Sequence, residues 1–489
     1  MVINIGSRRE VFWDEFIIDT TRTTAYELMH HPVRREAVMI NDAPWEGNGW
    51  IHTCVLEDNG IFRMYYITMP MWNEELTAYG PPFRHSCYAE STDGIHWTKP
   101  RVGDFMFRGS YDNNIITDKS LTSFDVLIDP NPDCPPDEKY KAIIAKKAEK
   151  GSELYCMFSG DGVHFRDGYM ISNKGWVNPF DSHNTLNWDP HRKKYVCYCR
   201  DVQVTDRVIV HDFFPFNEWM RNKRAIWRIE SDDFRNWSDP EFIDYGDSPY
   251  GFEMYTNGIM PYPRADHIYI GLPMRYYERP EWTPTYDRLC GSEHRKWRMQ
   301  RGKRFGLALT DALFMCSRDG KTFKRWDQAF MTPGPESPYA WIYGDCSLTH
   351  GILATDTIVK GEDKELSMYV TVNNWTDQPQ QMYRYTLRID GFISRRADFE
   401  KRLLVTKAFT FEGSKLSVNF STSAIGYIRI IIEDIYGNPI DGYTGYELFG
   451  DSTDRYVDFP SPLEALNGKP IRMRIEMRDA DIYSFKFDK

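Results

Sequence analysis

The sequence lacks the long apolar runs that membrane-spanning helices need, since no stretch approaches about 18 consecutive apolar residues. Its first ten residues, Met1 to Glu10, also lack the apolar core of a secretory signal. Basic residues are outnumbered, because 60 Lys and Arg face 71 Asp and Glu and leave a net charge of −11. Phosphate-backbone binders depend on clustered basic residues, so we expect neither a nucleic acid nor a membrane as a partner.

Paired cysteines are also missing. The 9 cysteines are scattered, odd in number and without a Cys-x-x-Cys pair. This usage favours reduced thiols in a cytoplasmic protein over a disulfide framework, and it signals no zinc site. We therefore predict a cytoplasmic protein with no metal site and no cofactor, while a structural or central calcium or sodium ion stays compatible with the sequence.

Aromatic residues, by contrast, are abundant, at 15% of 489 residues. Tyr and Trp suit β-strands, and their flat faces also stack on sugar rings. Aromatic-rich β cores account for most of them. With 41% hydrophobic and 27% charged residues, the composition is that of a globular chain of two or three domains.

A short turn motif, Ser-x-Asp followed by Gly or Phe, recurs four times and points to a repeat architecture. The copies begin at Ser91, Ser159, Ser231 and Ser317, at intervals of about 70–85 residues. In each copy the Ser and Asp side chains can bond nearby backbone amides, and strand-like sequence precedes it. A fifth unit without the motif would contain strands at 346–350, 365–372 and 382–388. Five such units predict a five-bladed β-propeller.

The pattern of apolar and polar residues changes after Asp390. Residues 393–489 alternate between apolar and polar side chains, which is typical of an antiparallel β-sandwich. We therefore predict an all-β fold, with a five-bladed propeller in residues 1–392 followed by a sandwich in 393–489. The segment Val11–Ile18 is a candidate for the strand that closes the ring, and residues 285–304 for a short helix.

An acidic residue recurs near the start of each unit. Since the inner strands of a propeller point one end at a central funnel, acids that head these strands converge. Cleavage of a glycosidic bond needs two carboxyl groups, one as proton donor and one as base or nucleophile. The predicted catalytic group is Glu46, Asp125, Asp181, Glu253 and Asp345.

Other side chains near these acids are candidates for substrate binding. His52, His183 and His350 could bond sugar hydroxyls or surround a central ion, although structural histidines are the favoured interpretation. Arg275 could bind substrate or pair with a funnel acid. The remaining candidates are Asn184 and two tryptophans that could stack on sugars or pack in the core, Trp50 and Trp341.

Several segments carry a resemblance to a known superfamily. They are the four turns and Asp42–Glu46, Asp129–Pro132, Phe180–Asn184 and Tyr255–Asn257. On these residues the chain resembles the five-bladed β-propeller glycoside hydrolases of families 32, 43, 62 and 68, in particular members without an assigned substrate. The sandwich resembles the one that follows the propeller in family 32. The nucleophile motif of that family, Trp-x-Asn-Asp-Pro-Asn-Gly, does not occur here.

The resemblance implies roles by blade position. Glu46 would be the base or nucleophile, Asp125 the orienting acid that tunes the pKa of the donor, and Asp181 the proton donor, with Glu253 as a rival donor. The superfamily usually places Asp, Asp and Glu at the first three positions, so the residue types differ in this chain.

Three functions remain open. The first is a glycoside hydrolase that removes a terminal sugar, a furanoside or a related one, from oligosaccharides, and the second is a non-catalytic carbohydrate-binding propeller. The third is a scaffold for protein partners, but scaffold propellers repeat more regularly and need no acid in each blade. An oligosaccharide is the expected partner, and a homo-oligomer is compatible with the sequence.

Overall fold

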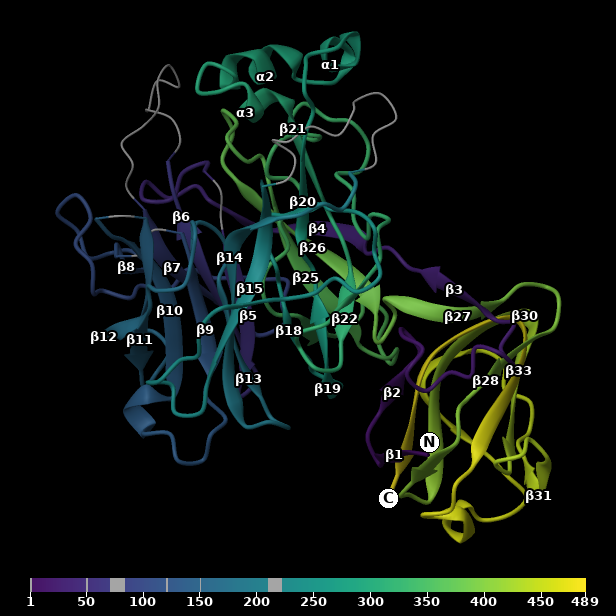
Figure 1. Ribbon diagram of the computed structural model, residues 1–489. Helices are drawn as coiled ribbons and strands as arrows, with labels where there is room; N and C mark the ends of the chain where they lie inside the picture. The colour runs from purple at the N-terminus through teal and green to yellow at the C-terminus, as the bar shows by residue number, and fades with distance from the viewer. Residues whose placement is uncertain (1, 50–51, 71–83, 120–121, 150, 210–221) are drawn as a thin grey trace.

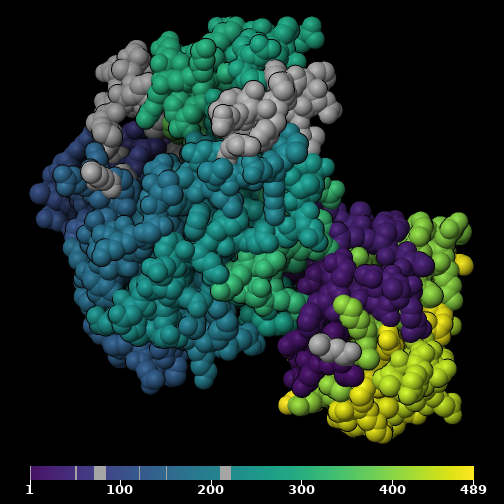
Figure 2. Space-filling view, in the orientation of Figure 1, coloured from purple at the N-terminus to yellow at the C-terminus, as the bar shows by residue number. Residues whose placement is uncertain are grey.

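The computed structural model describes residues 2–49, 52–70, 84–119, 122–149, 151–209 and 222–489 and is almost entirely β-structure (Figure 1). Among these residues no helix is long and apolar enough to cross a membrane. All nine cysteines are free thiols. The chain forms a large lobe of successive small sheets and a smaller lobe that contains both termini (Figures 1 and 2).

Five four-stranded antiparallel sheets of the described residues build the large lobe. The first is β5 (Thr53–Asp58), β6 (Ile61–Thr68), β7 (His85–Ser91) and β8 (Ile115–Thr117). The second is β9 (Phe124–Ile128), β10 (Tyr140–Lys147), β11 (Ser152–Ser159) and β12 (Arg166–Ser172), with the short helix η1 (Pro136–Glu138) between β9 and β10. The third is β13 (Thr185–Asp189), β14 (Lys194–Val204), β15 (Asn222–Ser231) and β16 (Glu241–Phe242).

The last two sheets complete the ring. The fourth is β18 (Met260–Tyr262), β19 (Ala265–Gly271), β22 (Met315–Ser317) and β23 (Lys324–Arg325). The fifth is β24 (Leu353–Thr355), β25 (Glu365–Val372), β26 (Gln381–Arg388) and β4 (Val33–Ile40). The first strands of consecutive sheets contact one another, β24 with β5, β5 with β9, β9 with β13 and β13 with β18. The predicted all-β fold with a five-bladed propeller is therefore confirmed.

Ring closure differs from the expectation. The closing strand is β4, which pairs with β26 as the outer strand of the fifth blade. The candidate Val11–Ile18 contributes only its first residue to a strand, and that strand belongs to the small lobe. β4 escaped sequence analysis because its residues Val33–Ala37 are exposed and mostly charged. The first strand of the fifth blade is Leu353–Thr355 and not 346–350.

Each Ser-x-Asp turn joins the third strand of a blade to the fourth, as the bounds of β7, β11, β15 and β22 show. In the first copy Gly94 N donates to Ser91 Oγ (2.9 Å), and the amides of Ile95 and His96 donate to Asp93 Oδ1 (2.8 Å each). The other three copies repeat the Asp contacts. The fifth blade has no copy because its fourth strand, β4, comes from the N-terminal part of the chain.

Neighbouring strands of a blade are antiparallel, so each inner strand begins on the face where the second strand ends. We call this face the loop face; the Ser-x-Asp turns lie on the opposite one. The fourth blade is extended here by a sheet of β17 (Glu253–Met254), β20 (Met274–Glu278) and β21 (Ala308–Ala312). Between β20 and β21 lie α1 (Pro284–Arg288), α2 (Ser292–Arg298) and α3 (Arg304–Leu307), at the top of Figure 1.

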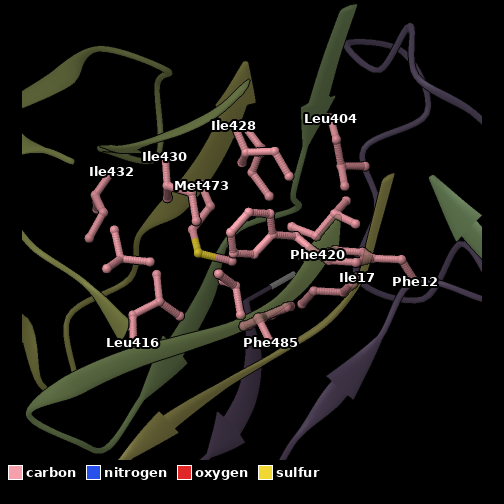
Figure 3. Packing of buried hydrophobic residues seen from close by; sticks show 14 of the residues in the cluster. Phe12, Ile17, Leu404, Leu416, Phe420, Ile428, Ile430, Ile432, Met473 and Phe485 are labelled. Carbon is pink, nitrogen blue, oxygen red and sulfur yellow. The ribbon is translucent and has the colours of Figure 1, made fainter. Parts of the chain in front are cut away.

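The small lobe is a β-sandwich built around two long strands, β30 (Lys415–Glu433) and β33 (Arg472–Asp488). Their pairing shifts between Thr422 and Tyr427, so each long strand is divided into two paired halves. Figure 3 shows the core, where side chains such as Phe420, Ile430 and Phe485 are fully buried. The remaining C-terminal elements are β27 (Ile393–Ala397), β28 (Arg402–Val405), β29 (Phe409–Phe411), β31 (Pro439–Thr444), β32 (Asp451–Val457) and η3 (Leu463–Leu466).

Residues 2–29 also contribute strands to the sandwich. β1 (Ile3–Gly6) pairs with β29, β2 (Glu10–Val11) with β33, and β3 (Tyr26–Met29) with β27. Phe12 and Ile17 are buried in the same core (Figure 3). In Figure 2 the purple N-terminal residues accordingly cover part of the green and yellow lobe. The expected division into 1–392 and 393–489 placed these N-terminal strands in the propeller. Short strands that pair with distant partners leave no local sequence pattern, so their place in the sandwich was not predicted.

Candidate functional site

Two of the five predicted acids are bound in backbone turns. Glu46 is fully buried, and its carboxylate accepts from Tyr66 Oη (2.7 Å), Ala43 N (2.9 Å) and Lys99 Nζ (2.8 Å). Asp345 repeats the turn, since its Oδ2 accepts from Ile342 N (2.9 Å). Burial raises the pKa of Asp345 to about 7, although backbone hydrogen bonds and two nearby arginines oppose the shift. Both carboxylates therefore hold chain segments at the edges of their blades.

A third acid, Asp125, lies where four blades meet. Its Oδ1 accepts from Leu186 N (2.8 Å), and its Oδ2 lies 2.9 Å from Nδ1 of His350. The other ring nitrogen of His350 lies 3.1 Å from Ile259 O, which can only accept, so Nε2 carries a proton. The Asp125–His350 pair thus ties the inner ends of the second, third, fourth and fifth blades together.

Two further histidines line the axis above this pair. The rings of His52 and His183 stack at 5.5 Å, and His183 lies 6.2 Å from His350. Burial lowers the pKa of both His52 and His183 to about 3, so both rings are neutral at pH 7. Among the described residues, neither nitrogen of the buried His183 has a hydrogen-bond partner. Asn184 is structural, because it bonds Ser123 Oγ in the neighbouring blade (2.9 Å).

The remaining two acids, Asp181 and Glu253, are each held by an arginine that stacks on Tyr255. Arg200 pairs with Asp181, and Arg224 donates to Glu253 at 2.5 Å. The two guanidinium groups lie 5.2 and 5.1 Å from the centre of the Tyr255 ring. Tyr255 in turn shares a 2.5 Å hydrogen bond with Tyr343. Asp181 and Glu253 therefore belong to one neighbourhood on the loop face.

A cavity of about 490 Å³ adjoins this neighbourhood beside the extension of the fourth blade. It is walled by aromatic rings and contains acidic and basic groups, which is typical of a sugar-binding pocket. Three predicted residues line it, Glu253, Arg275 and Trp341. Arg275 forms an ion pair with Asp311, to which it donates two hydrogen bonds of 2.8 and 2.5 Å. Burial raises the pKa of Asp311 despite this pairing.

The same cavity contains a second glutamate close to Glu253. Glu253 is opposite Tyr276 in the pairing of β17 with β20, and Glu278 is two residues further along β20, on the same face. Such diagonal neighbours are about 7–8 Å apart, and their Cβ atoms are somewhat closer. Lys223 Nζ lies 3.7 Å from Glu253, and the charges of both glutamates act on it. Tyr276 donates to Glu278 at 3.0 Å.

The structure thus distributes the predicted residues over four places. Glu253, Arg275 and Trp341 share the cavity; Asp125, His52, His183 and Asn184 lie along the axis; Glu46 and Asp345 lie in turns. Asp181 is on the loop face, and Trp50 lies outside the described residues. Sequence analysis missed Glu278, Lys223 and the arginines around Tyr255. The only available signal was the alternation Met274–Glu278, which puts Tyr276 and Glu278 on one face.

One group of potential metal ligands occurs in the described part of the chain, away from the loop face. Ligand atoms of His191, Asp266 and His267 lie within 4.8 Å of one another. His191 bonds Asp266 (2.8 Å), and His267 contacts Glu10 (3.4 Å). These contacts satisfy the charges within the group, so it needs no ion to account for its geometry.

Comparisons with known proteins are distant. No family model and no curated protein matches the sequence. Among solved structures, a family 43 arabinoxylan arabinofuranohydrolase from Bacillus subtilis is 12% identical, with a TM-score of 0.42 over 93% of this chain and 99% of that one. A family 32 β-fructofuranosidase from Bombyx mori is 10% identical, with a TM-score of 0.42 over 93% and 94%. An N-acetylgalactosamine deacetylase from F. plautii is 10% identical, with a TM-score of 0.42 over 75% and 95%. These likenesses assign no activity to the chain.

Proposed function

We propose that this protein is a glycoside hydrolase that removes a terminal sugar from an oligosaccharide, with Glu253 and Glu278 as its carboxylate pair. The observation that carries the proposal is the placement of both glutamates on one face of β17–β20, inside a cavity with aromatic walls. Diagonal neighbours of this kind are about 7–8 Å apart, and glutamate side chains from such positions can place their carboxyl groups within the roughly 5–9.5 Å range of retaining and inverting glycosidases.

The surroundings suggest a division of roles. Glu253 faces two cations, Arg224 and Lys223, which oppose its negative charge and suit a base or nucleophile. Glu278 accepts a hydrogen bond from the Tyr276 hydroxyl and, as the other member of the pair, is the proposed proton donor. The assignment of catalytic roles by blade position is less favoured, because the carboxylate oxygens of Glu46 and Asp125 already form hydrogen bonds within the protein.

The volume and lining of the cavity limit the size and kind of substrate. A volume of about 490 Å³ is within the range of pockets for small ligands, so one or two sugar rings fit better than a long polymer segment. Tyr277 and Trp341 line the cavity and offer flat faces to a sugar ring. We therefore propose exo-action on short oligosaccharides, and a furanoside or related terminal sugar stays the proposed substrate.

A screen of aryl glycosides and plant oligosaccharides with the purified protein tests this function. On any substrate that is cleaved, Glu253→Gln and Glu278→Gln should each lower kcat by about 10²–10⁴-fold. The matched control is Glu241→Gln, an exposed glutamate of the propeller paired with Lys321 (2.8 Å), and it should leave kcat unchanged. Unchanged kcat in both cavity variants would contradict the assignment of the pair. Sugar binding without any cleavage would favour the carbohydrate-binding alternative.

A further inference from the structure

Trp341 adopts a backbone conformation that costs free energy. Its φ is +60°, in the left-handed region, where the Cβ of a bulky residue approaches the backbone too closely. Trp341 also lines the cavity, and its indole Nε1 donates to Gly334 O (2.8 Å). A strained conformation persists only where the surrounding structure enforces it, and such positions are common in ligand-binding sites. The contacts of the neighbouring residues show how the conformation of Trp341 is enforced.

The residues on either side of Trp341 are each held by a buried charged side chain. Arg295, which is 1% exposed, donates to the carbonyl oxygen of Ala340 (3.0 Å). Asp345 accepts from the backbone nitrogen of Ile342 (2.9 Å). Burial raises the pKa of Asp345 and lowers that of Arg295, and the charge of each residue opposes the shift of the other. The two side chains therefore hold Trp341 from both sides and also attract each other.

Helix α2 contacts the same segment at three points. Gly291, the residue before α2, is followed by Arg295 and Arg298 at intervals of four and three residues, so all three lie on one face of the helix. A Cβ at Gly291 would overlap the carbonyl oxygen of Pro338, so only glycine allows this approach. Beyond the bond made by Arg295, Arg298 donates to Tyr343 O (3.3 Å). The helices inserted between β20 and β21 thus support the segment that carries the tryptophan.

The sheet that carries the proposed catalytic pair supports the segment as well. Thr310 in β21 donates to Asp345 O (2.9 Å) and accepts from Gly344 N (3.1 Å). β21 is paired with β20, the strand of Glu278, and Thr310 also lines the cavity. Trp341 is therefore fixed relative to the proposed catalytic strands as well as to α2.

From these contacts we infer that Trp341 is the residue on which the sugar stacks in the cavity, and that Arg295 and Asp345 are positioning residues that hold its indole in place. A flat indole face selects a sugar ring with a face of C–H groups and needs no charge on the ligand. The inference rests on the proposed function for the identity of the ligand as a sugar. It adds that the sugar is neutral, and that two residues outside the described cavity lining control its affinity.

Calorimetric titration of the full-length protein with neutral sugars tests the stacking without turnover. The probes are L-arabinose, D-xylose, D-fructose and D-galactose, together with their methyl glycosides. Trp341→Ala should weaken the affinity for the sugar that binds about tenfold or more, whereas Trp341→Phe keeps a flat ring and should retain most of the affinity. The inference is overturned when none of these sugars binds, or when Trp341→Ala binds as the unchanged protein does.

The left-handed conformation allows a second test, because glycine adopts it without strain. Trp341→Gly should weaken sugar binding as Trp341→Ala does, and it should leave the melting temperature unchanged or raise it. Trp375 is the matched control, since its φ is also +60°, but its ring is buried and stacks on Phe305 at 4.5 Å. Trp375→Gly should therefore lower the melting temperature. An equal loss of stability in both variants would assign Trp341 a structural role and overturn the inference.

Substitutions at Asp345 and Arg295 separate the positioning role from general stability. Asp345→Asn keeps an oxygen that accepts from Ile342 N and should bind the sugar as the unchanged protein does, whereas Asp345→Ala should bind it at least about threefold more weakly. Arg295→Ala should show a similar loss, and Arg295→Lys, which keeps a donor, should restore part of the affinity. The control Arg384→Ala removes a fully buried arginine of the fifth blade that pairs with Glu36 (2.8 Å), and it should lower stability without changing the affinity. Unchanged affinity in both Asp345→Ala and Arg295→Ala would remove the positioning role.

The two proposals fail separately. Cleavage of a glycoside with a KM that Trp341→Ala leaves unchanged would remove the stacking role and keep the hydrolase. Trp341-dependent binding of a neutral sugar by a protein that cleaves no glycoside would keep the stacking role and remove the hydrolase.

Discussion

The propeller and the sandwich bury very different side chains. The sandwich core is a continuous cluster of aliphatic and aromatic residues drawn from both ends of the chain. The propeller, in contrast, contains the largest fully buried charged residues, Arg228, Arg295, Arg298 and Arg384. Such groups stabilise only when they are paired, whereas apolar area stabilises without a partner.

The difference separates stability from chemistry. The sandwich core is mainly apolar, and its buried acids Glu433 and Asp481 are paired with arginines, so the described residues of its interior provide no candidate site. The propeller accepts buried charge along its axis and on its loop face, at the ends of strands whose blades already pack on their neighbours. Functional residues are found where a rigid scaffold tolerates groups that are costly to bury.

The largest expected effect tests whether the N-terminal segment stabilises the sandwich. Phe12 is fully buried and stacks on Phe485 at 5.4 Å. Phe12→Ala should lower the free energy of unfolding by about 3–5 kcal/mol, because it removes a ring from a closed core. Denaturant unfolding measures this. Phe399→Ala, at a side chain that is 64% exposed, should change it by less than about 0.5 kcal/mol. Equal effects would contradict the inclusion of the N-terminal segment in the core.

A second variant tests the charged junction between the lobes. Burial alone would raise the pKa of Glu10, but the hydrogen bond to His267 and the charge of Arg318 lower it from 4.5 to about 2. A lowered carboxyl pKa stabilises the fold above pH 4.5, and the contribution is lost as the pH falls from 4.5 towards 2. Glu10→Gln should therefore cost about 3 kcal/mol at pH 7 and about half of that at pH 3.

Thermal unfolding between pH 3 and pH 8 follows this loss. Glu447→Gln, at an exposed pair 3.5 Å from Arg429, is the control and should show no pH-dependent difference. A Glu10→Gln deficit that is independent of pH would mean that packing, and not charge, accounts for the role of Glu10.

Asp345 should behave in the opposite way. Its pKa is raised from 3.8 to about 7, so the folded protein holds a proton that the unfolded chain has lost, and stability declines as the pH rises from about 4 to 7. Asp345→Asn should thus stabilise the propeller at pH 8, because it removes a buried negative charge. The gain should be limited to about 1–2 kcal/mol, because the buried amide still lacks some hydrogen-bond partners. Thermal unfolding at pH 5 and pH 8 checks this, and a gain at pH 5 alone would contradict it.

Sequence analysis predicted those parts of the fold whose pattern is local. The strand-like sequence that precedes the four turns, at 62–67, 140–145, 195–199 and 267–272, lies almost wholly within β6, β10, β14 and β19, the second strands of the first four blades, where both faces are buried. Closure by β4 could not be predicted, since Val33–Ala37 is mostly charged. The pairing of Glu253 with Glu278 in the candidate site could not be predicted for a related reason. Glu253 and Glu278 meet through a two-residue strand, and such a strand has no periodicity to detect.

The smallest expected effect concerns the repeated turns. The turns themselves could be predicted from the sequence, but their contacts with the preceding blade could not. Tyr369 of the fifth blade donates to Gly94 O in the first (2.8 Å), and Tyr65 of the first donates to Gly162 O in the second (2.8 Å). Each turn therefore docks on a tyrosine of the preceding blade. Tyr369→Phe should cost about 0.5–1.5 kcal/mol, because one buried hydrogen bond is lost while the ring stays.

Tyr369→Phe also tests whether the propeller differs from the sandwich in depending on polar links between its units. Tyr443 of the sandwich donates to Pro462 O at 3.0 Å, so Tyr443→Phe removes a comparable bond within the other lobe. Denaturant unfolding followed by tryptophan fluorescence measures both variants. If polar links join the blades, Tyr369→Phe combined with Tyr65→Phe should destabilise by more than the sum of the single changes, because both loosen the first blade. Strict additivity would mean that each turn stabilises only its own contact, and that apolar packing alone keeps the blades together.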